Sequence, residues 1–432
     1  MSSTLEVAGG RPLRGRLRVP GDKSISHRAL LLGALAEGTS HVTGMAAGDD
    51  VARTAAALQA LGAGVDFDVV DRVGAATVSG GRRRLHASAT PLEVANSGTS
   101  MRLLAGVCAS LPWTTTIGGD ESLSGRPMDR VAVPLRRMGA AVDGVGDTVR
   151  PPLTVRGGDL HGIDYVLPVP SAQVKGTVLL AGLGAEGDTV VRESVLTRAH
   201  TEEMLAAVGG DVEVSADHLT TRVRASKLEP FRLDVAGDPS QAAFWVVAAC
   251  ITPGSDVVIE RVYVGQARAG FLDVLRRMGA LVDVEPAADG TADIRARYGP
   301  LRGTAVGGAE VAGLIDEIPV LAVAAALAEG PTTFADASEL RVKETDRAAA
   351  LASELAALGI PVEERPDGLV VPGAMRFRGG AVRSHGDHRM AMAMAVAGMA
   401  SDENAGVVRI EGWDSVLTSY PGFEEDLQQL CR

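Results

Sequence analysis

The sequence predicts a protein of the α/β or α+β class with mixed sheets and two domains, because of its length and one recurring pattern. The chain has 432 residues, and a single hydrophobic core stops growing beyond about 250 to 300 residues, so we expect two domains of roughly 200 residues each. Hairpin patterns, as in residues 68–80, mix with helical patterns, as in residues 130–138.

The recurring pattern is an apolar helical stretch, then a glycine, then a short strand in which apolar and polar residues alternate. It occurs five times, and its glycines are Gly62, Gly139, Gly209, Gly279 and Gly359. Their spacings of 77, 70, 70 and 80 residues suit a repeated unit of several strands and two helices. We expect each glycine to end its helix in a left-handed conformation. A run of Rossmann units would instead have longer, wholly apolar strands.

Two places in the chain favour a crossing between domains. Pro20 and Gly21 interrupt a strand pattern, and residues 228–240 contain two prolines and a glycine. We therefore expect a discontinuous first domain of residues 1–20 and 235–432, and a second domain of residues 21–234, with the functional site in the cleft between them.

Composition excludes several classes of function. Apolar residues make up 46% and charged residues 22% of the chain, and the formal net charge is −12, which argues against a nucleic-acid or anionic-membrane partner. The N-terminus has no export or transit signal, and no apolar run reaches the roughly 18 residues of a spanning helix. We expect a cytoplasmic protein in which an anionic ligand would meet a local basic pocket.

The sequence also predicts that no metal or other cofactor takes part. Cys108, Cys250 and Cys431 are too few and too scattered for a metal cluster or a disulfide framework, and the first two lie in apolar runs typical of buried thiols. HExxH, CxxC and GxSxG motifs do not occur. Residues 182–187 match GxGxxG, but they follow a helix pattern and precede a strand, the reverse of a dinucleotide site.

Several motifs place anion-binding groups at predicted helix starts, where backbone N–H groups and the helix dipole favour negative charge. They occupy residues 19–28, 96–102, 171–173 and 387–389. Residues 119–128 form a loop in which Arg126 precedes a proline, and Arg198 follows later. Each motif alone could be an ordinary capped helix with solvated basic residues.

Two acidic and basic motifs lie in the last third of the chain. Asp316 and Glu317 precede an apolar helix, where they could simply be cap residues. Lys343 and Arg347 are four residues apart, and we expect them on one face of a helix with Glu344 beside them. The methionine stripe after Arg389 is typical of core. Together, the motifs predict a site for a small polyanionic molecule, with six basic residues: Lys23, Arg28, Arg126, Lys343, Arg347 and Arg389.

These motifs resemble those of the 5-enolpyruvylshikimate-3-phosphate (EPSP) synthases, in order and spacing over nearly the whole chain. The matching segments are residues 20–38, 96–104, 119–128, 169–183, 314–326, 341–347 and 387–393. The resemblance implies an EPT/RTPC-like inside-out α/β barrel in two globular halves, built from six pseudo-repeats. It also implies transfer of the enolpyruvyl group of phosphoenolpyruvate to the 5-hydroxyl of shikimate 3-phosphate, without a cofactor, by a monomer, with glyphosate as a possible inhibitor.

The resemblance also implies roles for individual residues, with Thr99 beside the donor loop. Those expected to hold phosphoenolpyruvate are Lys23, Asn96, Gly98, Arg126, Gln173, Arg347 and Arg389. Those expected to hold shikimate 3-phosphate are Lys23, Ser24, Arg28, Ser171, Ala172, Gln173, Arg198, Asp316 and Lys343. Those expected to act in catalysis are Asp316, Lys343, Glu344 and Lys23, with Asp316 and Lys343 deprotonating the acceptor hydroxyl and Glu344 protonating the vinyl carbon.

Two positions depart from the common family pattern. Thr418 stands where many members have a lysine, and Ala172 stands where a serine is commoner. Both features resemble glyphosate-tolerant synthases, yet Gly98 is kept, so glyphosate sensitivity stays open. Two alternatives remain: a UDP-N-acetylglucosamine enolpyruvyl transferase, although residues 113–126 lack that family's usual cysteine, and a paralogue that has lost or altered turnover.

Overall fold

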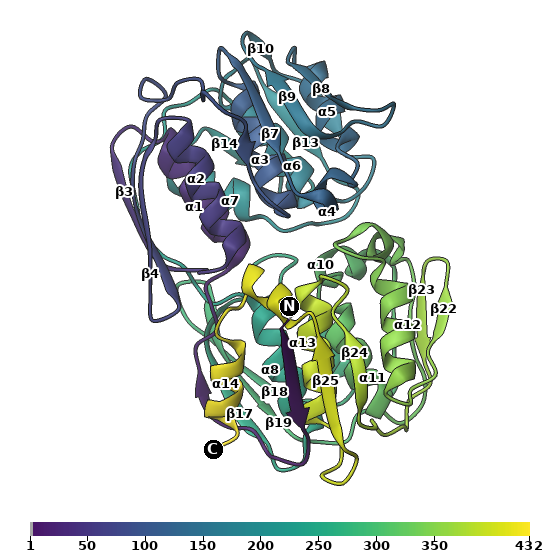
Figure 1. The fold of residues 1–432 in the computed structure, drawn as a ribbon. Coiled ribbons are helices and arrows are strands. Elements are labelled where there is room, and N and C mark those ends of the chain that lie inside the picture. The colour runs from purple at the N-terminus through teal and green to yellow at the C-terminus, as the bar shows by residue number, and fades with distance from the viewer. Residues whose placement is uncertain (1–2) are drawn as a thin grey trace. The chain divides into compact units, whose positions relative to one another are not determined.

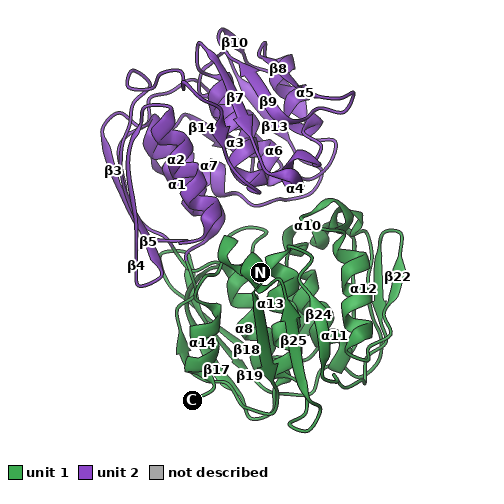
Figure 2. Cartoon of the chain, in the orientation of Figure 1, with its two compact units in different colours: residues 1–20, 236–432 green, residues 21–235 purple. Residues whose placement is uncertain are grey.

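The computed structural model describes residues 3–432 and divides the chain into two compact units (Figure 2). Unit 1 comprises Met1–Pro20 and Ala236–Arg432, and unit 2 comprises Gly21–Val235. Within the described residues, no helix is both long enough and apolar enough to cross a membrane.

Unit 2 contains three four-stranded sheets with one shared topology. In each sheet an edge strand pairs parallel with the next strand, and two antiparallel pairings follow. The strand orders are β16(Arg232–Asp234)-β3(Thr39–Met45)-β5(Val73–Ser79)-β4(Gly64–Val70), β6(Leu92–Glu93)-β7(Thr114–Gly118)-β9(Arg150–Arg156)-β8(Ala141–Val145) and β11(Asp164–Val166)-β13(Thr189–Arg192)-β15(Thr220–Val223)-β14(Val212–Val214). A short parallel pair joins β10(Leu160–His161) and β12(Ala185–Glu186).

Unit 1 repeats this topology twice and then in a split form. The complete sheets are β2(Arg14–Leu17)-β17(Asp256–Tyr263)-β19(Thr291–Arg297)-β18(Leu281–Pro286) and β20(Ala305–Val306)-β21(Thr332–Phe334)-β23(Gly368–Val371)-β22(Glu363–Arg365). The last sheet pairs β24(Gly380–Arg383) parallel with β25(Val407–Glu411), and β25 antiparallel with β1(Thr4–Ala8). The sixth repeat is therefore shared between the two chain ends, which is why sequence periodicity revealed only five copies.

Six helices are almost entirely buried, three in each unit (Figure 1). They are α1(Lys23–Leu35), α3(Gly98–Ala109) and α6(Ala172–Gly182) in unit 2, and α8(Pro239–Ile251), α11(Ile318–Leu327) and α13(His388–Met399) in unit 1. Each packs on its own sheet and on a neighbouring buried helix. Helices thus lie inside each unit and sheets outside, which is the inside-out arrangement that the resemblance implies.

The remaining helices are shorter or have one exposed face. Five of them pack on the strand that follows them, namely α2(Asp49–Ala60), α5(Asp129–Arg137), α7(His200–Ala207), α9(Gly270–Arg277) and α12(Arg347–Ala357), whereas α14(Phe423–Leu430) packs on β2. Short turns of helix complete the chain: α4(Glu121–Ser124), α10(Val311–Leu314), η1(Gly308–Glu310), η2(Ser338–Val342) and η3(Trp413–Thr418).

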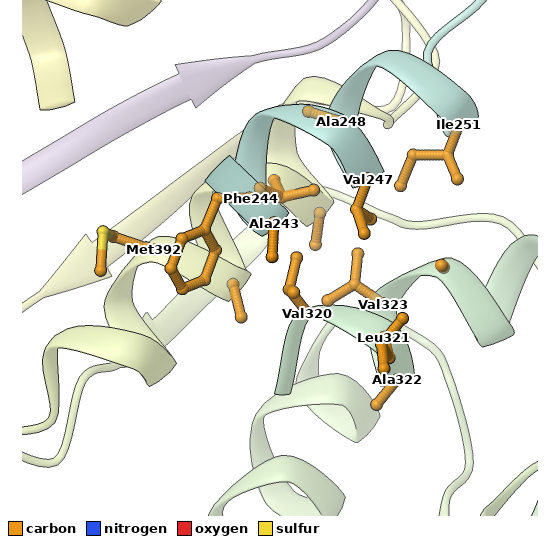
Figure 3. Packing of buried hydrophobic residues seen from close by; sticks show 14 of the residues in the cluster. Ala243, Phe244, Val247, Ala248, Ile251, Val320, Leu321, Ala322, Val323 and Met392 are labelled. Atoms are coloured by element: carbon orange, nitrogen blue, oxygen red, sulfur yellow. The ribbon is translucent and has the colours of Figure 1, made fainter. Parts of the chain in front are cut away.

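Small apolar side chains allow the buried helices of unit 1 to pack closely. Figure 3 shows Ala243 and Val247 of α8 facing Val320 and Val323 of α11, with Met392 of α13 beside Phe244. The whole methionine stripe of α13 is buried, which confirms its assignment to the core. Cys108 and Cys250 are buried as predicted, and burial raises the pKa of each thiol to about 12.

The five repeat glycines all have the left-handed conformation that their sequence context predicts. Their φ angles lie between 82° and 109°, and each follows the C-cap residue of its helix. A residue with a Cβ atom is disfavoured in this conformation by roughly 1–2 kcal/mol. The glycines therefore fix the sharp exit from each exposed helix into the following strand.

We predict that Gly279→Ala lowers the free energy of unfolding by about 1–2 kcal/mol, and that Gly279→Asn lowers it less. A Cβ at position 279 would meet nothing closer than the Pro300 carbonyl oxygen at 3.8 Å, so the cost is conformational. Gly270→Ala is the control, because its Cβ would have ordinary contacts and its φ is not positive. Equal midpoints of urea unfolding for the two alanine variants would contradict this reading.

Candidate functional site

Three buried helices of unit 2 begin at capping residues that the motifs contain. The side chains of Asp22, Ser97 and Ser171 accept hydrogen bonds from the backbone N–H groups of Ile25, Ser100 and Val174. The three helix starts predicted from residues 19–28, 96–102 and 171–173 are therefore confirmed. Because the rest of each helix is apolar and buried, its polar groups collect at this end.

The first helix start carries two cations with different surroundings. Lys23 is partly exposed, and its Nζ lies 3.0 Å from Asp50 Oδ2 at the start of α2. Arg28 is buried, and it donates from Nε to Thr201 Oγ1 at 2.7 Å and from Nη1 to the Ser24 carbonyl at 3.0 Å. These two hydrogen bonds hold its guanidinium group against α7 and the first turn of α1.

The second and third helix starts are joined by Gln173. Its Oε1 accepts from Arg102 Nη1 at 2.5 Å, and its Nε2 donates to Thr99 Oγ1 at 2.9 Å. Arg126, from the loop after α4, donates to Asn96 Oδ1 at 2.6 Å. The structure therefore brings together the predicted residues of the loop and of both helix starts.

Gly98 lies next to the guanidinium groups of Arg102 and Arg126. A Cβ built at position 98 would be 3.0 Å from Arg102 Nη1 and 3.4 Å from Arg126 Nη1. A side chain there would press on both guanidinium groups, so the glycine allows them to approach the start of α3. Arg102 was missed in the sequence, although it closes the 96–102 motif.

Three further predicted residues of unit 2 lie close in sequence to the residues just described. Ser171 caps α6, Ala172 is its first residue, and both are half-buried. Arg198 is half-buried in the segment between β13 and α7, three residues before Thr201, which holds Arg28. These residues therefore lie on or next to α6 and α7.

Unit 1 gathers its charged residues around one carboxylate, that of Asp316. Asp316 Oδ1 lies 3.5 Å from Lys343 Nζ and 3.2 Å from Arg347 Nη1. Asp316 Oδ2 lies 3.8 Å from Arg389 Nη2, and the Asp316 carbonyl accepts from Arg389 Nη1 at 3.2 Å. Three cations predicted from two separate motifs thus have Asp316 as a common partner.

Arg347 is the most enclosed of these cations. It is 1% exposed, and besides Asp316 it bonds Asp387 at 2.7 Å and Glu344 at 2.6 Å. Burial by itself lowers the pKa of Arg347, but the charges of Asp387, Glu344 and Asp316 outweigh burial and raise it above its usual value. Arg347 remains charged, and it holds Glu344 in place.

The expectation that Lys343 and Arg347 share one helix face is wrong. Lys343 has an extended backbone just after η2, and α12 begins only at Arg347. The cause is Asp346, whose side chain accepts from the Ala349 N–H and caps a new helix. The two cations meet at Asp316 through this break in the chain.

A second buried group in unit 1 was not found from the sequence. Arg268 pairs with Asp238, the cap of α8, and lies 3.6 Å from Glu317 Oε1 at the start of α11. Glu317 makes no capping bond, and it also accepts from the Ser240 hydroxyl. Arg268 lies in a loop without a recognisable motif, so only its folded position reveals its partners.

Position 418, where the resemblance leads us to expect a lysine, carries a neutral threonine. Thr418 is half-buried and donates from Oγ1 to the Ser415 carbonyl at 2.8 Å.

Comparison with known proteins gives the family directly. The family model described as EPSP synthase (3-phosphoshikimate 1-carboxyvinyltransferase) matches residues 7–427. The chain belongs to the EPSP synthase family. It is 48% identical over 436 aligned residues to a 3-phosphoshikimate 1-carboxyvinyltransferase of Gloeobacter violaceus, with 100% of this chain and 99% of that protein covered. A relative from Alkalilimnicola ehrlichii with the same description is 49% identical, with 97% and 94% covered.

Solved structures agree with this family. The EPSP synthase from Acinetobacter baumannii matches with a TM-score of 0.85 and 41% identity, covering 100% of this chain and 98% of that one. The enolpyruvyl transferase NikO from Streptomyces tendae, at 21% identity, shares the fold with a TM-score of 0.79, over 100% of this chain and 98% of its own. The fold predicted from the resemblance is therefore confirmed.

A buried histidine beside the first helix start makes stability depend on pH. Burial, followed by the charges of Lys23 and Arg28, holds the pKa of His27 well below its usual value. In the unfolded chain the His27 imidazole takes up a proton near pH 6.5, whereas in the folded chain it stays neutral until a lower pH. His27 therefore costs no stability above pH 6.5, and stability is lost as the pH falls from there toward the folded pKa.

We predict that this loss reaches at most about 1.4 kcal/mol per pH unit. His27→Gln should remove that contribution, because an amide can still bond Thr54, the partner of His27 Nδ1 at 2.8 Å. The measurement is urea unfolding of both proteins from pH 7.5 to 5.5. Parallel curves of stability against pH would show that His27 is not the responsible group.

Proposed function

We propose that the chain is an enzyme that transfers the enolpyruvyl group of phosphoenolpyruvate to the 5-hydroxyl of shikimate 3-phosphate and releases phosphate. The family carries the name of this reaction. The observation that supports it most is the group around Asp316, where a lysine and two arginines surround one carboxylate and a second carboxylate, Glu344, bonds Arg347.

The reaction needs an acid, a base and fixed positive charge. The vinyl carbon of phosphoenolpyruvate is a poor base, so a positioned acid must protonate it while the neighbouring carbon becomes positive. The acceptor hydroxyl loses its proton and attacks that carbon, which gives a tetrahedral phospho-ketal. Removal of a proton from the new methyl group then expels phosphate and restores the double bond.

The residues of unit 1 suit the proton transfers. Glu344 would protonate the vinyl carbon, and Arg347 at 2.6 Å fixes one of its oxygens. Asp316 would accept the proton of the 5-hydroxyl, with Lys343 beside it at 3.5 Å. Arg347 and Arg389 would bind the anionic donor and offset charge on the departing phosphate.

The residues of unit 2 suit binding of both substrates. Lys23 and Arg126, with Asn96, Gly98 and Gln173, would hold phosphoenolpyruvate. The acceptor would be held by Lys23, Gln173 and the following residues: Ser24, Arg28, Ser171, Ala172 and Arg198. We propose that the charged groups of both units act on one pair of substrates, so the loss of either set would abolish turnover.

A phosphate-release assay with phosphoenolpyruvate tests the function. We expect release with shikimate 3-phosphate, and none with UDP-N-acetylglucosamine or without an acceptor. Release only with the UDP-sugar would identify the related transferase instead. Calorimetric binding of shikimate 3-phosphate without any release would identify a paralogue that has lost turnover.

We predict that Glu344→Gln slows turnover at least ~100-fold, because general acid catalysis typically contributes that much. The amide keeps the shape of the side chain, so both substrates should still bind in calorimetry. Glu363→Gln is the matched control, since Glu363 is exposed on β22 and pairs only with Arg365 at the surface. Near-normal turnover of Glu344→Gln would remove this residue from the mechanism.

We predict that Gly98→Ala weakens inhibition by glyphosate more than it raises KM for phosphoenolpyruvate. The added methyl group would press on Arg102 and Arg126, at 3.0 and 3.4 Å, and would narrow the space beside the donor. Steady-state inhibition measured against phosphoenolpyruvate checks this. Equal changes in the inhibition constant and in KM would refute it.

A further inference from the structure

A buried ionic cluster in unit 2 lies outside the groups assigned to substrates. Lys175, in the second turn of α6, has its Nζ 2.6 Å from Glu193 Oε2 and 2.7 Å from Glu202 Oε1. The three residues are at most 7% exposed. They are one lysine and two glutamates, enclosed among apolar helices.

Stability alone does not account for such a cluster. Moving charges out of water costs several kcal/mol per ion, and apolar residues of similar size often give an equally stable or more stable protein. The cluster is therefore better explained by a need to hold a particular segment of the chain in place. The two glutamates flank one segment of chain, residues 193–202, which connects β13 to the first turn of α7.

This segment makes further contacts that fix its path. The Thr197 hydroxyl donates to Glu193 Oε1, the carboxylate oxygen that does not bond Lys175. Thr201 Oγ1 accepts from Arg28 Nε at 2.7 Å. Lys175 is thus tied through Glu193 to Thr197, and the same segment holds Arg28 four residues later.

Gly176, the residue after Lys175, lets α6 approach this segment. A Cβ at position 176 would lie 2.7 Å from Thr201 Oγ1 and 3.2 Å from Arg28 Nη2. Two successive residues of α6 therefore contact residues 193–202. Lys175 forms ion pairs with its two glutamates, and Gly176 leaves room for Thr201.

We propose that the cluster of Lys175, Glu193 and Glu202 positions residues 197–202, and through them Arg28 and Arg198. This inference rests on the proposed function, in which those two arginines hold shikimate 3-phosphate. Lys175, Glu193, Thr197 and Thr201 are positioning residues. Their alteration should impair acceptor binding selectively, whereas damage to general packing would affect both substrates and turnover alike.

The first test changes Thr201, which bonds Arg28 directly. Thr201→Val keeps the shape and removes the oxygen acceptor, so KM for shikimate 3-phosphate should rise about tenfold, the usual effect of losing a hydrogen bond to a charged group. KM for phosphoenolpyruvate and kcat should change less than about twofold. Thr201→Ser restores the hydroxyl and should recover most of the affinity.

The second test changes the cluster itself. Glu193→Gln leaves Lys175 paired one to one with Glu202, so no carboxylate is left unbalanced, while the link to Thr197 weakens. We expect a rise of several-fold, and up to about tenfold, in the same KM. Thr189→Val is the matched control, because Thr189 is buried on β13 and its hydroxyl has no hydrogen-bond partner in the structure; its KM values should stay unchanged.

The outcomes separate this inference from the proposed function. Wild-type protein that releases no phosphate with shikimate 3-phosphate would overturn the function. If the wild type is active, the inference is overturned by an unchanged KM for shikimate 3-phosphate in folded Thr201→Val, or by equal losses in both KM values and kcat that Thr201→Ser does not repair. An unchanged KM for shikimate 3-phosphate in folded Glu193→Gln would also overturn it. Should that variant not fold, Thr197→Val, which removes the hydroxyl bonded to Glu193, takes its place with the same expectation.

Discussion

The structure depends on the burial of six apolar helices, three in each unit. A helix surrounded by apolar neighbours can present polar groups only at its ends, and its N-terminal end also offers unpaired N–H groups and a positive partial charge. Within each unit, hydrogen bonds and ion pairs join these helix starts to one another. The same constraint that builds the two cores therefore concentrates charged side chains at a few short segments of the chain.

Several of the charged groups are paired with carboxylates of the same unit. Lys23 is paired with Asp50, while Lys343, Arg347 and Arg389 gather around Asp316. Such pairing lets a chain of net charge −12 keep dense positive charge in fixed positions. Fixed charges need no rearrangement when a reaction develops charge, which is the main reason that enzymes use them.

Much of this could be predicted from the sequence because the signals were local. Helix starts, left-handed glycines and apolar runs each lie within a few residues, and five repeat glycines took the expected conformation. Arg268 and the Lys175 cluster were missed because their partners are remote in the chain. Lys343 was placed wrongly because Asp346, read as part of a helix, in fact caps the start of a new one. The sixth repeat was hidden because β1 and β25 come from opposite chain ends.

The proposed function requires that cations of both units act on one donor molecule. Its most direct test is phosphate release at saturating shikimate 3-phosphate, with the concentration of phosphoenolpyruvate varied, for wild type, Arg126→Lys and Arg389→Lys. Lysine keeps the charge but loses the planar fork of arginine. The account predicts that each substitution raises KM for phosphoenolpyruvate about tenfold or more, although the residues belong to different units. An unchanged KM in either variant would contradict it.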